Sequence, residues 1–197
     1  LDRSSAASDV YKRQLITQGS QGLIASHVPL LLAPDEGPYG TLYGHLARAN
    51  PHWQALAEGG EALVIFAGEQ AYISPSFYPS KAEHGKAVPT WNYLAVHAYG
   101  QPGVFDDHDR LLALVSRLSS KHEANRPEPW AVSDAPSEYI DSMLKAIVGF
   151  SVPISRLIGK RKLSQNRSTA DQLGVRDGLL ANPNSHDHAL AHLMAKE

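Results

Sequence analysis

A series of short apolar stretches, separated by Gly, Pro and Asp residues, restricts the fold of this sequence more than any other feature. Each stretch has the length of a β-strand, and the breaks between them contain residues that favour tight turns. Short strands at close spacing are typical of a β-barrel or β-sandwich rather than of alternating strands and helices. The stretches cover residues 23–32, 40–45, 62–66, 71–74 and 93–99.

Turn and cap residues predict how these stretches are connected. Residues 33–38, Ala-Pro-Asp-Glu-Gly-Pro, predict a turn that joins the first two strands into a hairpin. Asn50 and Pro51 predict a short helix over residues 52–56, because Asn caps helices and Pro suits their first position. After residue 105 the pattern becomes mainly helical. We expect helices over 111–118 and 137–147, a strand over 148–158, and a helical or partly frayed tail from Ser168 onward.

Composition excludes several classes of protein. The 197 residues include no cysteine, so disulfides and thiolate zinc sites are excluded, which fits a reducing cytoplasm. The formal net charge of -2 provides no general attraction for nucleic acid. The apolar runs are far shorter than the roughly 20 residues that a membrane-spanning helix needs. We therefore predict a cytoplasmic protein with one ordinary globular domain and no membrane association.

The densest polar cluster lies at residues 43–51, where a predicted strand meets a predicted helix. Such a corner presents free backbone N–H groups and the positive end of a helix, so Arg48 and Asn50 are placed to hold a phosphate. A purely capping role for both residues is the alternative.

A second cluster combines aromatic, hydroxyl and amide side chains at residues 72–81 and 88–93. These groups offer flat faces and hydrogen bonds to a planar heterocycle, and Lys81 or Lys86 would add positive charge. An aromatic-rich loop packed on the barrel is the alternative.

A third cluster places five cations within residues 156–167. The stretch suits a phosphate or a nucleic acid, with a solvated basic surface as the alternative. The Ser-Gln-Asn-Arg that ends it favours directed hydrogen bonds over simple solvation. The sequence has no Gly-rich dinucleotide motif, P-loop or nucleophile elbow. His186, His188 and His192 lack the acidic partners that a metal site would need.

Together the three clusters resemble the FMN-binding negative transcriptional regulator family of the PaiB type. This family is a branch of the split barrels that include flavin reductases and pyridoxamine-phosphate oxidases. The resemblance spans residues 15–178, with Arg161 standing where relatives tend to carry an aromatic residue. It rests on the strings SHVPL (26–30), GHLARANP (44–51), YISPSFY (72–78), VPTWNY (88–93), IVG (147–149) and KLSQNR (162–167).

The resemblance implies a mainly β fold with flanking helices (α+β), an FMN-binding split β-barrel. It also implies a homodimer with FMN at the subunit interface. The phosphate is expected near Arg48 and Asn50, and the ring near residues 72–78 and 90–93. No catalytic or metal-binding residue is assigned. The residues expected to bind FMN are His27, Pro29, His45, Arg48, Asn50, Ser74, Tyr78, Lys81, Thr90, Trp91, Asn92, Lys162, Gln165 and Arg167.

The same resemblance suggests how the chain is divided. Residues 15–105 are expected to form the FMN-binding core, and residues 106–178 a helical segment with a returning strand packed on it. Residues 179–197 are expected to be a tail. Residues 1–14 are polar and rich in Ser and Ala. They are expected to be either a non-native leader or a frayed N-terminus. They occupy the position where the family has a short helix and its first strand.

The function implied by the family is repression of degradative-enzyme and sporulation genes. DNA contact through residues 156–167 is one way to achieve it, although the sequence shows no helix-turn-helix. The net charge favours a flavin role for Lys162, Gln165 and Arg167 instead. The alternatives are an FMN-dependent oxidoreductase or flavin reductase, in which FMN carries the electrons, and a haem-binding split barrel.

Overall fold

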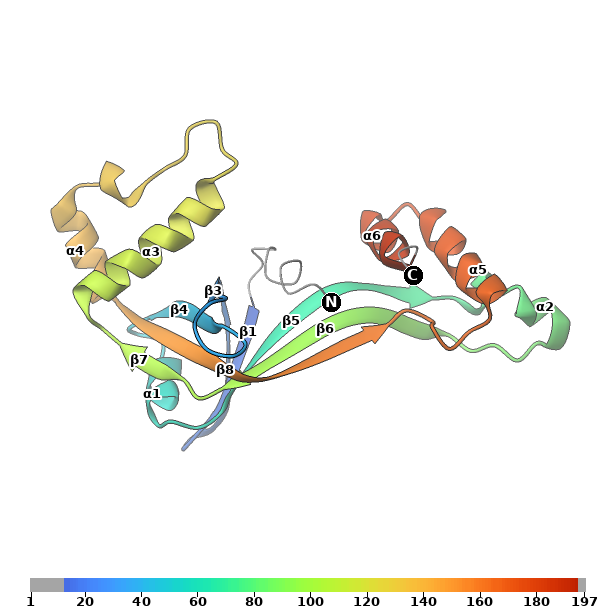
Figure 1. The fold of residues 1–197 in the computed structure, drawn as a ribbon, viewed down its shortest axis with the longest axis horizontal. Coiled ribbons are helices and arrows are strands. Elements are labelled where there is room, and N and C mark those ends of the chain that lie inside the picture. Colours follow the sequence, from blue (N-terminus) through green and yellow to red (C-terminus); the bar gives the residue numbers. More distant parts are fainter. Residues whose placement is uncertain (1–12, 195–197) are drawn as a thin grey trace. The chain divides into compact units, whose positions relative to one another are not determined.

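The computed structural model describes residues 13–194, which form an α+β structure with eight strands and six α-helices (Figure 1). The strand order is β2-β1-β5-β6-β8-β4-β3, with β7 paired to β8. The α+β class predicted from the sequence is confirmed. The strands are β1 (Arg13–Gly19), β2 (Gly22–Val28), β3 (Leu31–Ala33), β4 (Thr41–Ala47), β5 (Ala62–Ile73), β6 (Thr90–Gly100), β7 (Gly103–Phe105) and β8 (Ile147–Lys162).

The helices are α1 (His52–Ala57), α2 (Ser80–His84), α3 (His108–Glu123), α4 (Ser137–Lys145), α5 (Thr169–Leu180) and α6 (Ser185–Met194). Two short 3-10 turns, η1 (Pro75–Phe77) and η2 (Val132–Asp134), accompany them. Among the described residues, no helix is long and apolar enough to cross a bilayer.

The chain divides into two compact units. Among the described residues, unit 1 comprises residues 13–66 and 97–158, and unit 2 comprises residues 67–96 and 159–194. Strands β5, β6 and β8 are long enough to contribute to both units.

Unit 1 is built from antiparallel strand pairs around one hydrophobic core. Strand β1 pairs with β2 and β5, and β4 pairs with β3 and β8. Leu15, Leu56 and Phe150 are fully buried in this core. Gly44 admits the Phe150 ring, because a Cβ at position 44 would lie 2.6 Å from the ring Cζ. The hairpin predicted at residues 33–38 is confirmed by the pairing of β3 with β4.

Helix α3 covers part of unit 1 through a second apolar cluster. Leu114 and Leu118 of α3 pack with Leu31 of β3. Asp107 caps the helix, because its carboxylate accepts the Arg110 N–H at 2.9 Å. The helix predicted around residues 111–118, with acidic residues at its positive end, is therefore confirmed.

Unit 2 consists of the far ends of β5, β6 and β8 together with α2, α5 and α6. Helices α5 and α6 lie beside each other in Figure 1, and their side chains share one core with the strand ends. Ile73 of β5, Val175 of α5 and Leu190 of α6 are fully buried in it.

Three parts of the chain differ from the sequence-based expectation. The stretches 62–66 and 71–74 are one strand, β5, because neighbouring strands supply its hydrogen bonds even where residues 67–70 have no apolar pattern. The expected tail 179–197 begins inside α5 and continues as α6, and Leu179 is fully buried. Of the suspected leader, Arg13 and Gln14 belong to β1, and residues 1–12 lie outside the described residues.

Candidate functional site

The fourteen residues expected to bind FMN lie in both compact units. Unit 1 holds His27, Pro29, His45, Arg48 and Asn50. Unit 2 holds Ser74, Tyr78, Lys81, Thr90, Trp91, Asn92, Lys162, Gln165 and Arg167.

Arg48 follows β4 and is held by backbone carbonyl groups. Its Nε donates to the Lys145 carbonyl at 2.9 Å, and its Nη2 donates to the Ile147 carbonyl at 3.1 Å. The carboxylate of Asp106 lies 3.7 Å from Nη2. Arg48 therefore ties the end of β4 to the junction of α4 and β8, and Nη1 is the part of the guanidinium without a hydrogen-bond partner among the described residues.

Both polar atoms of the Asn50 side chain have partners within unit 1. Its Oδ1 accepts the His52 N–H at 3.0 Å in the first turn of α1, and its Nδ2 donates to Ser26 Oγ at 3.2 Å. The first of these is the helix-start contact that the sequence allowed as an alternative to phosphate binding.

His52 lies at the centre of a buried polar network. Its Nε2 is 2.8 Å from Thr17 Oγ1, and its Nδ1 is 2.8 Å from Ser26 Oγ. Each hydroxyl can donate or accept, so a neutral imidazole satisfies both contacts. Burial lowers the pKa of His52 below the ordinary value. The network therefore joins β1, β2 and α1 around a neutral ring.

His45 of β4 has a buried ring nitrogen without a partner. Its Nδ1 contacts no hydrogen-bonding group among the described residues, and burial lowers the pKa of the ring. A buried polar atom without a partner is rare in folded proteins and indicates either a ligand or a solvent molecule.

Unit 1 is expected to lose stability as the pH falls below about 6.5. The folded state lowers the pKa of both His45 and His52, so the unfolded chain binds protons first as the pH falls. Their stabilising contribution is therefore complete above the ordinary histidine pKa and is lost below it. Urea unfolding midpoints at about pH 7.5 and about pH 5.5 measure the effect.

His108 provides the opposite dependence and serves as a control. Hydrogen bonds to Asp109, and then to Asp141, raise its pKa, so its contribution is present at low pH and is lost as the pH rises. Its side chain is half exposed, so this contribution is small. His52→Gln is expected to reduce the loss below pH 6.5, whereas His108→Gln is not. A midpoint independent of pH would contradict the prediction.

Unit 2 carries an exposed aromatic pair. The rings of Tyr72 on β5 and Trp91 on β6 meet edge to face with centroids 6.2 Å apart, and the residues are 49% and 53% exposed. Their strand neighbours Ile73 and Asn92 are buried, so alternation places Tyr72 and Trp91 on the sheet face opposite the core. Half-exposed aromatic rings offer a flat heterocycle a surface to lie against.

Residues 162–167 contact the strand that carries Trp91. Lys162 Nζ donates to Thr90 Oγ1 at 2.6 Å. The fully buried Asn92 donates from Nδ2 to Ser164 Oγ at 2.9 Å. Ser164 has a φ of 64°, in the left-handed region that side chains with a Cβ rarely adopt. The structure thus brings the second and third sequence clusters together.

Gln165 closes the turn that contains Ser164. Its Oε1 accepts the Leu163 N–H at 2.7 Å, and its Nε2 donates to the Arg161 carbonyl at 3.0 Å. The Gln165 amide therefore stabilises the backbone of its own turn. Ser74 does the same at the start of η1, where its hydroxyl accepts the Ser76 N–H at 3.2 Å.

Arg167 lies over the ring of Tyr78, with its Cζ 4.9 Å from the ring centroid. The Tyr78 hydroxyl is buried and has no hydrogen-bond partner among the described residues. The end of the 162–167 turn and the segment after η1 thus meet at the Tyr78 ring.

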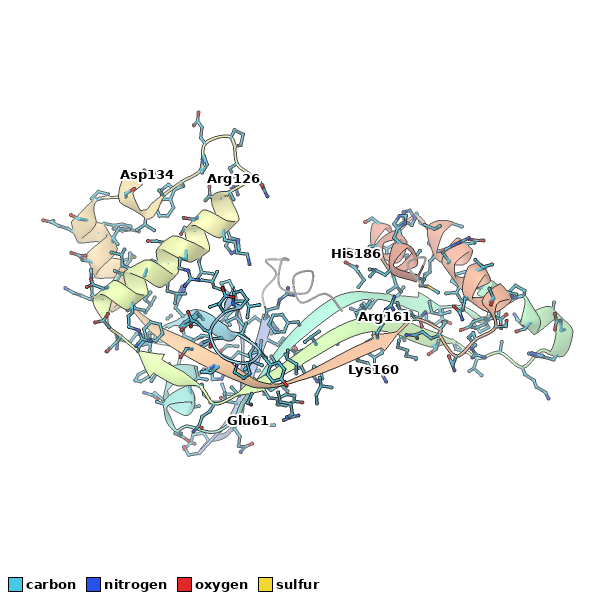
Figure 2. All side chains as sticks on the ribbon, viewed as in Figure 1. Glu61, Arg126, Asp134, Lys160, Arg161 and His186 are labelled. Carbon is cyan, nitrogen blue, oxygen red and sulfur yellow. The ribbon has the colours of Figure 1, made fainter. Side chains whose placement is uncertain are left out.

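The basic stretch 156–167 has partners within the chain. Arg156 lies 3.5 Å from the Tyr99 ring centroid and 3.3 Å from the Glu61 carboxylate. Arg161 Nη2 donates to the Leu193 carbonyl at 3.0 Å. Figure 2 marks Arg161 and Lys160 near the end of β8.

Asp171 of unit 2 was not identified from the sequence. Asp171 accepts hydrogen bonds from Ser80, both from the backbone N–H at 3.1 Å and from the hydroxyl at 2.8 Å. The pattern Ser168-x-x-Asp171 marks a helix start. Nothing in the sequence pattern indicates that Asp171 binds a residue 91 positions earlier.

Comparison with known proteins identifies the family. Residues 9–156 match the family model described as "Putative FMN-binding domain". The Protease synthase and sporulation protein PAI 2 of Bacillus subtilis is 34% identical over 171 residues, covering 87% of this chain and 79% of that protein. The chain belongs to the PaiB-type FMN-binding family. An uncharacterized protein from Aspergillus fumigatus is 38% identical over 197 residues, covering 79% of this chain and 76% of the relative.

Solved structures agree with the fold expected for a PaiB-type protein. The FAD and heme binding protein from Mycobacterium smegmatis superimposes with a TM-score of 0.59 at 13% identity, covering 85% of this chain and 73% of that one. The flavocytochrome Anf3 from Azotobacter vinelandii gives a TM-score of 0.58 at 9% identity, covering 87% and 71%. The predicted split β-barrel is therefore confirmed.

Membership of the PaiB-type family assigns FMN as the cofactor. The residues gathered in unit 2 fit this group. Lys162 and Arg167 provide positive charge for a phosphate, and Tyr72 and Trp91 provide aromatic surface. The Tyr78 hydroxyl is buried in the apolar core of unit 2, so Tyr78 contributes its ring, which supports Arg167, rather than a contact beside Tyr72 and Trp91.

Proposed function

We propose that this chain is a cytoplasmic, homodimeric flavoprotein that represses genes through its bound FMN, with the FMN phosphate held by Lys162 and Arg167. The observation that carries the proposal is the charge of these two residues. Neither lies within ion-pair distance of a carboxylate among the described residues, whereas Arg48, Arg126, Arg156 and Arg176 each do. The carboxylate of Asp171 acts on Arg167 only at longer range. A cation that is fixed by neutral groups keeps its charge available for an anion.

The neutral partners of Lys162 and Arg167 also fix their positions. Thr90 accepts one hydrogen bond from the Lys162 ammonium, which leaves two of its three donors for a phosphate. Tyr78 supports the Arg167 guanidinium through its ring face and leaves the edge donors available. When bound, FMN supplies one- and two-electron chemistry, and these residues hold and orient it.

Direct contact with DNA is less well supported than a flavin role. Arg156 lies against Tyr99 and Glu61, and Arg161 donates to the Leu193 carbonyl. With Lys162 and Arg167 proposed to hold the FMN phosphate, Lys160 is the cation of the basic stretch that is left for DNA. Helix α5 carries Asp171 and Asp177 against one cation, Arg176, so it lacks the charge of a recognition helix. Regulation is therefore proposed to depend on FMN.

Lys162→Ala and Arg167→Ala are each expected to raise the dissociation constant for FMN by roughly tenfold to a hundredfold. A charge-assisted hydrogen bond contributes on the order of 1.5–3 kcal/mol, and every 1.4 kcal/mol corresponds to about a factor of ten. Riboflavin lacks the phosphate, so its affinity is expected to stay nearly constant. Titrations that follow the quenching of flavin fluorescence measure both constants.

Two further variants make this test specific. Lys145→Ala removes an exposed lysine in unit 1 and is expected to leave the preference for FMN unchanged. Arg48→Ala tests the phosphate position expected from the sequence. If Arg48→Ala abolishes the preference for FMN and neither Lys162→Ala nor Arg167→Ala reduces it, the proposed position of the phosphate is wrong.

The regulatory part of the proposal has its own experiment. Light scattering is expected to show a dimer, and a reporter gene is expected to lose repression in the Lys162→Ala/Arg167→Ala variant. Mobility-shift assays at several salt concentrations are expected to show only weak DNA binding. DNA binding that survives flavin removal and is lost in Lys160→Ala/Arg161→Ala, with FMN affinity unchanged, would contradict the proposal.

A further inference from the structure

We infer that Asp171 is a positioning residue of the flavin site, which holds the segment after Tyr78 against Arg167 without contacting the flavin. The inference rests on the proposed function, because Tyr78 and Arg167 belong to the proposed FMN site. The family model matches residues 9–156, and Asp171 lies outside that match.

The first turn of α5 places the Asp171 carboxylate. Ser168 caps the helix and accepts the Asp171 N–H at 3.2 Å. In a complete capping box the carboxylate would return to the Ser168 N–H. Here its two oxygens accept the Ser80 N–H and the Ser80 hydroxyl instead. The Ser80 N–H belongs to the first turn of α2, where backbone donors have no partner within the helix. One acid of α5 therefore caps α2.

The charge of Asp171 connects both sides of the Arg167 and Tyr78 contact. The residue is 4% exposed, and its pKa is lowered, chiefly by the hydrogen bond from the Ser80 backbone. The positive charge of Arg167 lowers this pKa further. Asp171 is thus ionised at neutral pH, attracts Arg167, and binds the residue two positions after Tyr78.

The next turn of α5 adds a second anchor to the same segment. Gly174 meets the backbone of η1 so closely that a Cβ would lie 2.2 Å from the Phe77 carbonyl oxygen. Phe77 directly precedes Tyr78. The segment 77–80 is therefore fixed to α5 at both ends, by backbone contact at Phe77 and by the Asp171 carboxylate at Ser80.

The test compares three variants of α5 in the full chain. Asp171→Ala removes both acceptors and is expected to raise the FMN dissociation constant about tenfold, with little change for riboflavin. Asp171→Asn keeps one oxygen for the Ser80 N–H and is expected to retain most of the preference for FMN. Asp177→Ala is the matched control, because this exposed acid on the same helix pairs with Arg176 and is expected to change neither constant.

The ratio of the riboflavin and FMN dissociation constants separates positioning from loss of structure. Partial unfolding weakens both ligands equally, whereas displacement of Arg167 weakens FMN alone. Each variant is measured below its own unfolding transition, as followed by circular dichroism. If Asp171→Ala does not fold, Ser80→Ala removes one of the two contacts and is expected to reduce the ratio to a smaller extent.

The outcomes of the inference and of the proposed function are distinguishable. If Arg167→Ala reduces the ratio and Asp171→Ala leaves it at the wild-type value, the inference is wrong and the proposed function stands. If neither Arg167→Ala nor Lys162→Ala reduces the ratio, the proposed phosphate position itself is wrong.

Discussion

Gly174→Ala is expected to destabilise unit 2 by about 3 kcal/mol or more. The new Cβ would lie 2.2 Å from the Phe77 carbonyl oxygen and 2.8 Å from Pro79 Cδ. Alanine normally stabilises a helix interior by about 1 kcal/mol relative to glycine. The clash involves backbone, which cannot rotate away as a side chain does, so we expect it to exceed that gain. Urea unfolding followed by tryptophan fluorescence and circular dichroism measures the change.

A second glycine on the same face of α5 provides a suppressor test. A Cβ at Gly178 would lie 2.4 Å from the Phe77 ring, so Phe77→Ala is expected to restore part of the stability lost in Gly178→Ala. It is not expected to rescue Gly174→Ala, whose nearest neighbour is a backbone oxygen.

Gly103→Ala serves as the matched control for these glycine substitutions. The atom nearest to the new Cβ, Ser151 Oγ, lies 3.5 Å away, which is ordinary van der Waals contact. Its stability is expected to change by less than about 0.5 kcal/mol. A Gly174→Ala protein as stable as the wild type would show that α5 and η1 do not pack as described.

Asn92→Ala is expected to cost about 2–4 kcal/mol of stability and to weaken FMN binding. Asn92 is fully buried, and its amide binds the buried Ser164 hydroxyl. Truncation leaves that hydroxyl without a partner and creates a cavity. It also removes the contact that holds Ser164 at a φ of 64°. The turn that carries Lys162 and Arg167 is then released from β6. Unfolding and FMN titrations measure the two effects separately.

A double-mutant cycle tests this account of Asn92. Ser164→Gly removes the hydroxyl and relieves the positive φ, because glycine adopts this conformation without strain. Once the hydroxyl is absent, Asn92→Ala leaves no buried donor unpaired. The double variant is therefore expected to lose less stability than the sum of the two single variants. Strict additivity would contradict a direct interaction.

The sequence predicted the local elements well where the pattern was strong. The turn at residues 33–38 contains Pro and Gly at the bend, and the observed hairpin follows it. Helix α3 has a cap at Asp107 and apolar residues with helical spacing. The sequence pattern predicts two stretches where the structure has the single strand β5. Residues 67–70 include Gly, Glu and Gln, which do not continue the apolar pattern although the strand pairing extends through them.

The residues selected by the family motifs differ in the contacts that they make in the structure. The motifs that resembled the family selected residues that the structure gathers in unit 2, among them Thr90, Lys162 and Arg167. The same motifs selected Arg48, Asn50 and Gln165, whose side chains also bind backbone groups of the chain. A motif identifies the residues that a family retains, and it does not distinguish ligand contacts from contacts that shape the loop.

The sequence by itself determined the strand and helix periods, the turn residues and the absence of cysteine, because these depend on neighbouring residues or on composition alone. Only the tertiary structure decided which distant groups meet. Asn92 and Ser164 are 72 residues apart, and Ser80 and Asp171 are 91 residues apart. Neither pair produces a recognisable pattern in the sequence. Hydrogen bonds between such distant residues depend on how β5, β6, β8 and α5 pack together, and not on the backbone preferences of the bonded residues.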